Sequence, residues 1–147
     1  SDPNFVKHAH HLIENGIVIL PEFFGGQRLQ NIQREFNSLT TEKEIEPRGV
    51  VTIRGDKLKT SEPFSLAAAE PYLLRLAAHY WGKRVHLAQW GATRLYPIEP
   101  ENYGAFRYHH DTQGKQIKIM LLLTEVPECG QRMDYIPGTH KEHRRGY

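Results

Sequence analysis

Several signatures that quickly classify a protein are absent from this sequence of 147 residues. It has one cysteine, Cys129, so an internal disulfide is impossible and a reducing, cytoplasmic compartment is favoured. The longest apolar run, residues 119–123, is far too short for a membrane helix, and no signal-peptide pattern is present. The formal net charge of +2 is too small to indicate nucleic acid or an anionic membrane as a partner.

Common catalytic motifs are missing as well. The sequence contains no glycine-rich phosphate loop, no cysteine-rich zinc pattern and no serine nucleophile elbow, so these three kinds of site are not expected. The composition that remains, 39% hydrophobic and 24% charged residues, is typical of a globular protein, and the length fits one domain over residues 1–147.

Local start and stop signals predict three helices. Asp2-Pro3 is typical of a helix N-terminus, and Asn15-Gly16 is typical of a helix end. Gly25-Gly26 opens the second helix, residues 65–69 form a short helical piece, and residues 71–81 form the third helix. The apolar residues expected on the three buried faces are Phe5, Ala9, Leu12 and Ile13; Leu29, Ile32, Phe36 and Leu39; and Leu73, Ala77, Tyr80 and Trp81.

Short β-branched or alternating runs predict strands, most of which follow the third helix. They are residues 17–20, 50–54 with a turn at Gly55-Asp56, 85–96, 105–111, 116–124 and 132–136. Helices followed by strands indicate an α+β fold, mainly β, in which the helices pack on one face of a sheet.

A His and an Asp stand two residues apart in the stretch 106–112, just before the apolar run at 117–123. In a strand, His109 and Asp111 would point to the same face, whereas His110 would point away. One imidazole and one carboxylate are two of the three ligands that non-haem Fe(II) oxygenases use. The competing interpretation is a surface strand with two polar residues, or a histidine–aspartate ion pair without a metal.

Three flanking motifs make the pattern more specific. The His-x-Asp pair is followed by an apolar strand ending in Leu123-Thr124-Glu125-Val126, then by a turn, then by Pro137-Gly138-Thr139-His140-Lys141. This order resembles the phytanoyl-CoA dioxygenase superfamily, and residues 14–24 are similar to the opening strand of that family. The resemblance runs from about residue 4 to residue 145.

The resemblance implies both a fold and a function. The fold is a double-stranded β-helix, or jelly roll, buttressed by N-terminal helices. The function is that of an Fe(II)- and 2-oxoglutarate-dependent dioxygenase, in which His109 and Asp111 are catalytic metal ligands and dioxygen is consumed. The substrate is a small organic molecule that is hydroxylated or otherwise oxidised, and Asp111 argues against halogenation, because halogenating relatives carry a small residue there.

The sequence departs from the family pattern at its end. The family's second metal-binding histidine, and the arginine that pairs with 2-oxoglutarate, lie well downstream of Pro-Gly-Thr-His and are not found here. We therefore expect a domain that lacks its C-terminal strands. His140 and His143 are alternative third ligands, but they follow Asp111 more closely than the family's second histidine does.

Two cations are candidates for binding the cosubstrate. Lys118 interrupts the apolar run and would lie on the same face of a strand as Met120, Leu122 and Thr124. Because a buried ammonium needs an anionic partner, we expect it to contact a carboxylate of 2-oxoglutarate or of an acidic substrate. Arg94 is a similar case with less support. The alternative for Lys118 is an edge lysine that reaches water.

Two other functions stay open on the sequence. One is a cupin-like metalloprotein that does not use 2-oxoglutarate, and the other is a jelly-roll binding module without catalysis. Metal content and succinate release distinguish them. The substrate, the reaction outcome and the oligomeric state are not encoded in any motif of this chain.

Overall fold

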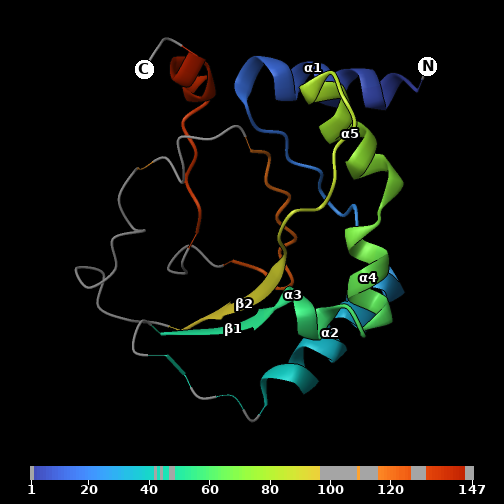
Figure 1. Ribbon diagram of the computed structural model, residues 1–147, viewed down its shortest axis with the longest axis vertical. Coiled ribbons are helices and arrows are strands. Elements are labelled where there is room, and N and C mark those ends of the chain that lie inside the picture. The colour runs from blue at the N-terminus through green and yellow to red at the C-terminus, as the bar shows by residue number, and fades with distance from the viewer. Residues whose placement is uncertain are drawn as a thin grey trace.

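The computed structural model of the chain is an α+β fold that joins helices to a two-stranded antiparallel sheet (Figure 1). It describes residues 2–41, 43, 45–46, 49–96, 109, 116–126 and 132–144. The elements are α1 (Pro3–Asn15), α2 (Gly26–Thr40), β1 (Val50–Arg54), α3 (Gly55–Leu58), α4 (Glu62–Ala68), α5 (Pro71–Trp81), β2 (Gly91–Leu95) and a 3-10 helix (Thr139–Arg144). None of the helices in the described ranges is long and apolar enough to cross a membrane.

The predicted boundaries of α1 and α5 are confirmed by their capping residues, whereas the short piece predicted at residues 65–69 is helix α4, Glu62–Ala68. The Asp2 carboxylate accepts a hydrogen bond from the Asn4 N–H at 2.9 Å, and the chain leaves α1 through Gly16 at φ 76°. The third predicted helix is α5, which has Pro71 at its first position and ends at Gly82 with φ 66°. A positive φ is unfavourable for residues with a Cβ. The glycine that follows each helix therefore sets the position of its C-terminal end.

The two strands bury one face against α2. Val51 lies opposite Arg94 and Ile53 lies opposite Ala92. Val51, Ile53 and Ala92 are buried, while the intervening Thr52 and Thr93 are exposed. Apart from Val50 at the start of β1, which is also buried, this alternation is the expected pattern for a strand with one covered face.

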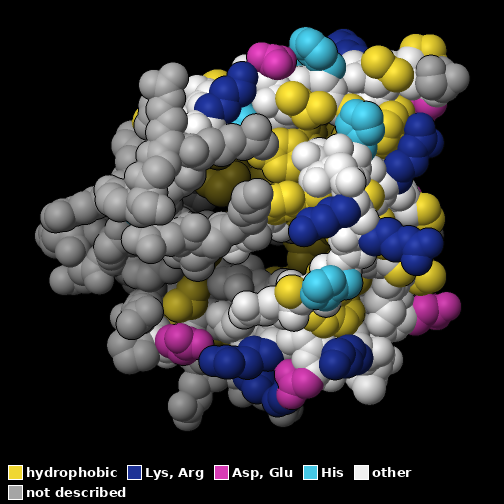
Figure 2. Space-filling model, turned by 45° about the horizontal axis from the view of Figure 1, so that its top comes forward, with side chains coloured by type: hydrophobic (Ala, Val, Ile, Leu, Met, Phe, Trp, Pro, Cys, Tyr) yellow, Lys and Arg dark blue, Asp and Glu magenta, His cyan; other side chains and the backbone are white. Residues whose placement is uncertain are grey.

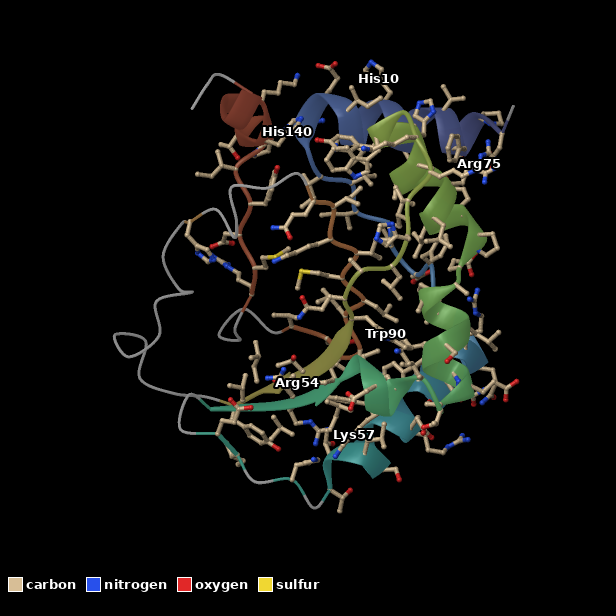
Figure 3. All side chains as sticks on the ribbon, in the orientation of Figure 1. His10, Arg54, Lys57, Arg75, Trp90 and His140 are labelled. Carbon is tan, nitrogen blue, oxygen red and sulfur yellow. The ribbon has the colours of Figure 1, made fainter. Side chains whose placement is uncertain are left out.

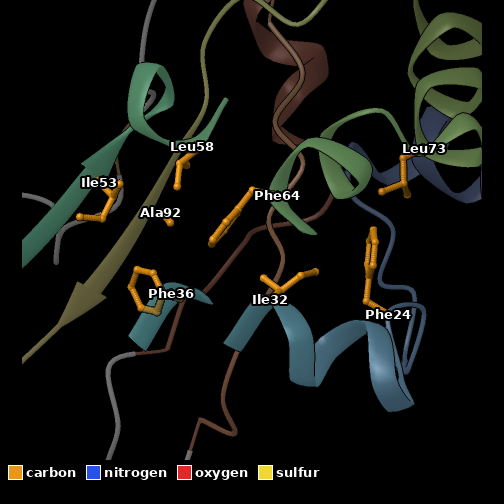
Figure 4. Close-up of a cluster of buried hydrophobic side chains, with 8 residues drawn as sticks. All are labelled: Phe24, Ile32, Phe36, Ile53, Leu58, Phe64, Leu73 and Ala92. Atoms are coloured by element: carbon orange, nitrogen blue, oxygen red, sulfur yellow. The ribbon is translucent and has the colours of Figure 1, made fainter. Parts of the chain in front are cut away.

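Two hydrophobic clusters hold the described residues together. The larger joins α2, the sheet and the short helices; its buried members are Phe24, Ile32, Phe36, Ile53, Leu58, Phe64, Leu73 and Ala92 (Figure 4). The smaller joins α1 to α5 through Phe5, Ala9, Leu12 and Leu76. Most of the predicted helix faces are therefore confirmed, but Ile13 is 40% exposed, because it has turned past the edge of the face that α5 covers.

Several predicted strands are wrong. Residues 17–20 and 85–90 form no strand, and Ile19 is 76% exposed. Gly55-Asp56 begins helix α3 instead of making a turn. Residues 116–124 and 132–136 run without regular secondary structure, because no described neighbour forms a ladder of hydrogen bonds with them. The predicted strand 105–111 lies outside the described residues except for His109.

Candidate functional site

The segment 116–126 crosses the molecule between the two hydrophobic clusters. Ile117 packs against the smaller cluster, and Leu121 and Leu123 pack against the larger one. The Gln33 side chain of α2 donates a hydrogen bond to the Leu123 carbonyl at 2.5 Å. The segment is therefore fixed to both clusters, although it belongs to no described sheet.

The other side of this segment is open to solvent. Lys118, Met120, Leu122 and Thr124 are all exposed, with Met120 at 59% and Leu122 at 64%. Their neighbour Ile119 is also half exposed, at 52%. Large apolar side chains that are exposed on neighbouring residues offer surface to a ligand or a partner.

The second extended segment, residues 132–136, has the same character. Met133 is 61% exposed and Ile136 is 48% exposed. Figure 2 shows a hollow in this view of the molecule, with hydrophobic side chains at its bottom. Accessible apolar side chains therefore come from two segments that are separate in sequence.

The predicted metal ligands are only partly described. His109 is exposed, whereas Asp111 and His110 lie outside the described residues. In the part of the chain that the structure describes, no three His, Cys, Asp or Glu side chains are grouped as a metal site. The chemistry of the donor pair itself fits Fe(II), since imidazole nitrogen and carboxylate oxygen are its usual ligands, but the described residues do not complete a coordination sphere.

The two candidate cations for the cosubstrate lie in different surroundings. The Arg94 guanidinium donates a hydrogen bond to the Asn37 side-chain oxygen at 2.5 Å and lies 5.0 Å above the centre of the Phe36 ring. Arg94 therefore holds β2 to α2. Lys118 instead lies on the exposed face with Met120. The two cations thus belong to different elements of the fold, strand β2 and the extended segment 116–126.

Two surface cavities were not expected from the sequence. One, of about 190 Å³, lies between α2 and α4 and is lined in part by Phe24, Arg28 and Leu66. The other, of about 340 Å³, lies beside Trp90 and Leu87. The Trp90 indole lines the second cavity and packs so closely on Gly55 that a Cβ there would lie 2.3 Å from the ring (Figure 3). Neither cavity contains a predicted ligand.

The Pro-Gly-Thr-His motif docks on the C-terminal end of α1. The Gly138 N–H donates to the Asn15 carbonyl at 2.9 Å, and His140 Nε2 lies 3.1 Å from the Ile13 carbonyl. The Lys141 ammonium lies 3.1 Å from the Glu14 carboxylate. The end of α1 thus meets a motif that lies 127 positions further along the chain, a contact that sequence spacing alone did not indicate. His140 serves this contact, and its Nε2 is not available as a metal ligand.

Comparison of the chain with family models, with curated proteins and with solved structures gives no match.

Proposed function

We propose that the chain is an Fe(II)- and 2-oxoglutarate-dependent dioxygenase domain that oxidises a small organic substrate. The finer fold that goes with this proposal is a jelly roll buttressed by the N-terminal helices, which needs eight strands. The proposal rests on the order of motifs along the chain and on the geometry of the segment that follows them.

One observation carries the proposal. Residues 116–126, which begin five positions after Asp111, form a segment that is anchored by Ile117, Leu121 and Leu123, whereas Met120 and Leu122 are exposed. An oxygenase needs a wall of this kind, because the substrate C–H bond must be held at a fixed place in an environment poor in water. Met120 and Leu122 supply the apolar surface of such a wall.

The roles of the polar residues follow from their donor chemistry. The His109 imidazole, in its neutral form, and the ionised Asp111 carboxylate would hold the metal. When bound, Fe(II) supplies the coupling of dioxygen reduction to the decarboxylation of 2-oxoglutarate, which yields succinate and carbon dioxide. The Lys118 ammonium would pair with a carboxylate of 2-oxoglutarate or of an acidic substrate. Arg94 is the weaker candidate for this task, because it lies on β2 and not in the segment that follows the metal motif.

An anaerobic titration with Fe(II) and 2-oxoglutarate tests the proposal. The chelate gives a weak visible charge-transfer band, which we expect for the native chain and not for His109→Ala or Asp111→Ala. The matched controls are His86→Ala and Asp56→Ala, which remove an exposed imidazole and an exposed carboxylate outside the motif and should keep the band. A native chain without the band, or an Asp111→Ala chain that retains it, would reject the assignment.

The same preparation distinguishes the two alternative functions. Bound iron with succinate release in air favours the dioxygenase, bound metal without succinate favours the cupin-like protein, and no metal favours the binding module. Lys118→Met tests the cosubstrate contact separately. An unchanged affinity for 2-oxoglutarate in that variant removes Lys118 from the site and leaves the iron assignment intact.

A further inference from the structure

The C-terminal end of α1 receives two hydrogen bonds from a turn far along the sequence. The last carbonyls of a helix have no partner within the helix. Here the Ile13 carbonyl meets His140 Nε2 at 3.1 Å, and the Asn15 carbonyl accepts the Gly138 N–H at 2.9 Å. Gly16 closes the helix from within by donating its N–H to the Leu12 carbonyl. The turn therefore completes the cap of α1 from outside.

The hydrogen bond to Ile13 fixes the state of the His140 ring. A carbonyl oxygen only accepts, so Nε2 must carry the proton. In the neutral ring Nδ1 then carries none. That atom is buried and has no hydrogen-bond partner among the described residues. The His140 ring also contacts Tyr80 of α5, with centroids 6.3 Å apart, so it touches both helices of the pair (Figure 3).

The His140 ring packs against the backbone of Gly16, in the space that a side chain at position 16 would occupy. A Cβ added at Gly16 would lie 2.3 Å from His140 Nδ1 and 2.4 Å from the Tyr135 hydroxyl oxygen. Gly82, at the end of α5, has a similar positive φ, of 66° against 76°, but a Cβ there would meet nothing within 4 Å. Gly16 and Gly82 thus end their helices in the same way, but only Gly16 has side chains packed against its Cα.

We propose that residues 135–141 are a clasp, closed by insertion of His140 and Tyr135 against Gly16, that positions the extended segment 132–136 on the α1–α5 pair. His140 is the positioning residue: its Nε2–H holds the turn to the helix end, and its bare Nδ1 faces the glycine. The outer ion pair between Lys141 and Glu14 is half exposed on both sides and contributes little. The clasp does not depend on iron and is separate from the proposed function.

Exchange of the Gly138 amide hydrogen reports whether the clasp is closed, since that N–H is bonded across it. Gly16→Ala should speed this exchange by about tenfold or more, because the new methyl group collides with the inserted side chains. Gly82→Ala is the matched control: it imposes the same backbone strain in open space and should leave Gly138 exchange unchanged. Equal effects of the two substitutions on Gly138 would overturn the clasp.

A second pair of variants keeps the test informative if Gly16→Ala fails to fold. His140→Gln retains an N–H that can reach the Ile13 carbonyl, whereas His140→Leu fills similar space without a donor. We expect Gln to keep Gly138 exchange within about threefold of the native rate, and Leu to accelerate it by about tenfold. Equal exchange in the two variants would refute the assigned role of His140.

The coupling between the two sides is measurable directly. In the Gly16→Ala background the ring can no longer insert, so adding His140→Leu should change Gly138 exchange by less than about threefold. Fully additive effects of the two substitutions would show that Gly16 and His140 act independently, and would contradict the clasp.

Discussion

Two regions of this molecule treat apolar side chains in opposite ways. All of the buried apolar side chains that the structure describes lie between Phe5 and Ala92, as Leu58 shows with 0% exposure, although others in this region, such as Ile19 at 76%, are exposed. The extended segments 116–126 and 132–136 present theirs to solvent, as Leu122 shows with 64% exposure. The first region is stabilised by burial, whereas the second is attached at a few points and has apolar surface left over. The difference means that the stability of the described fold comes mainly from the first region.

The largest expected effect comes from a matched pair of leucines. Leu58→Ala should lower the free energy of unfolding by about 2–5 kcal/mol, because it removes buried contacts and leaves a cavity. Leu122→Ala should change it by less than about 0.5 kcal/mol, because the side chain is already exposed. Urea unfolding followed by circular dichroism measures both. Similar losses in the two variants would mean that Leu122 is covered in solution and that the two regions do not differ.

The attachment of segment 116–126 to α2 is the next effect in size. Gln33→Ala removes the hydrogen bond to the Leu123 carbonyl and should cost about 0.5–1.5 kcal/mol. It should also speed tryptic cleavage after Lys118, since the segment loses a fixed point. Gln27→Ala, on the exposed face of the same helix, should do neither. Unchanged cleavage in Gln33→Ala would show that apolar packing alone holds the segment.

The two candidate cations, Arg94 in the first region and Lys118 in the second, should differ in their effect on stability. Arg94→Met should cost about 1 kcal/mol, because the guanidinium loses its hydrogen bond to Asn37 and its position over the Phe36 ring. Lys118→Met should cost less than about 0.5 kcal/mol, because Lys118 is exposed. Under the proposed function, Lys118→Met also weakens 2-oxoglutarate binding. Unfolding curves and a 2-oxoglutarate titration of both variants check these results. A larger loss of stability for Lys118→Met than for Arg94→Met would contradict the prediction.

Secondary structure was predicted more accurately from the sequence in the first region than in the second. The ends of α1 and α5 were predictable because Asp2-Pro3, Gly16, Pro71 and Gly82 act on the backbone within a few residues. Strand β1 was predicted with correct bounds from its β-branched run. Residues 116–124 were predicted as a strand for the same reason, but a strand also needs a hydrogen-bonded neighbour, and that neighbour is not a local property.

The candidate site shows the same limit. The spacing of His109 and Asp111 could be read directly, because they stand only two positions apart in the sequence. The docking of His140 on Ile13 joins residues 127 apart, and no local pattern encodes such a contact. A hint was present in Gly16 and the Pro-Gly-Thr-His motif, since each requires close backbone approach or a turn, but their partnership appears only in the fold.

The smallest expected effect concerns the outer ion pair of the clasp. The hydrogen bond and charge of Lys141 hold the pKa of the Glu14 carboxyl below its ordinary value of 4.5. A carboxyl whose pKa is lower in the folded state stabilises the fold above its unfolded pKa, and this contribution is lost as the pH falls through the lowered value. Lys141→Met should therefore reduce stability slightly near neutral pH and not at all in strong acid.

Urea midpoints of the native chain and Lys141→Met, taken from about pH 7 down to about pH 3, give the sign of this effect. The difference should be largest at neutral pH and vanish below the Glu14 pKa, and it should shrink in high salt, because both side chains are half exposed. Lys7→Met removes an exposed lysine from α1, the helix that carries Glu14, and is the control. A difference that grows toward acid would mean that Lys141 acts on a group other than Glu14. The clasp itself depends on His140 and Gly16 and should stay closed in either case.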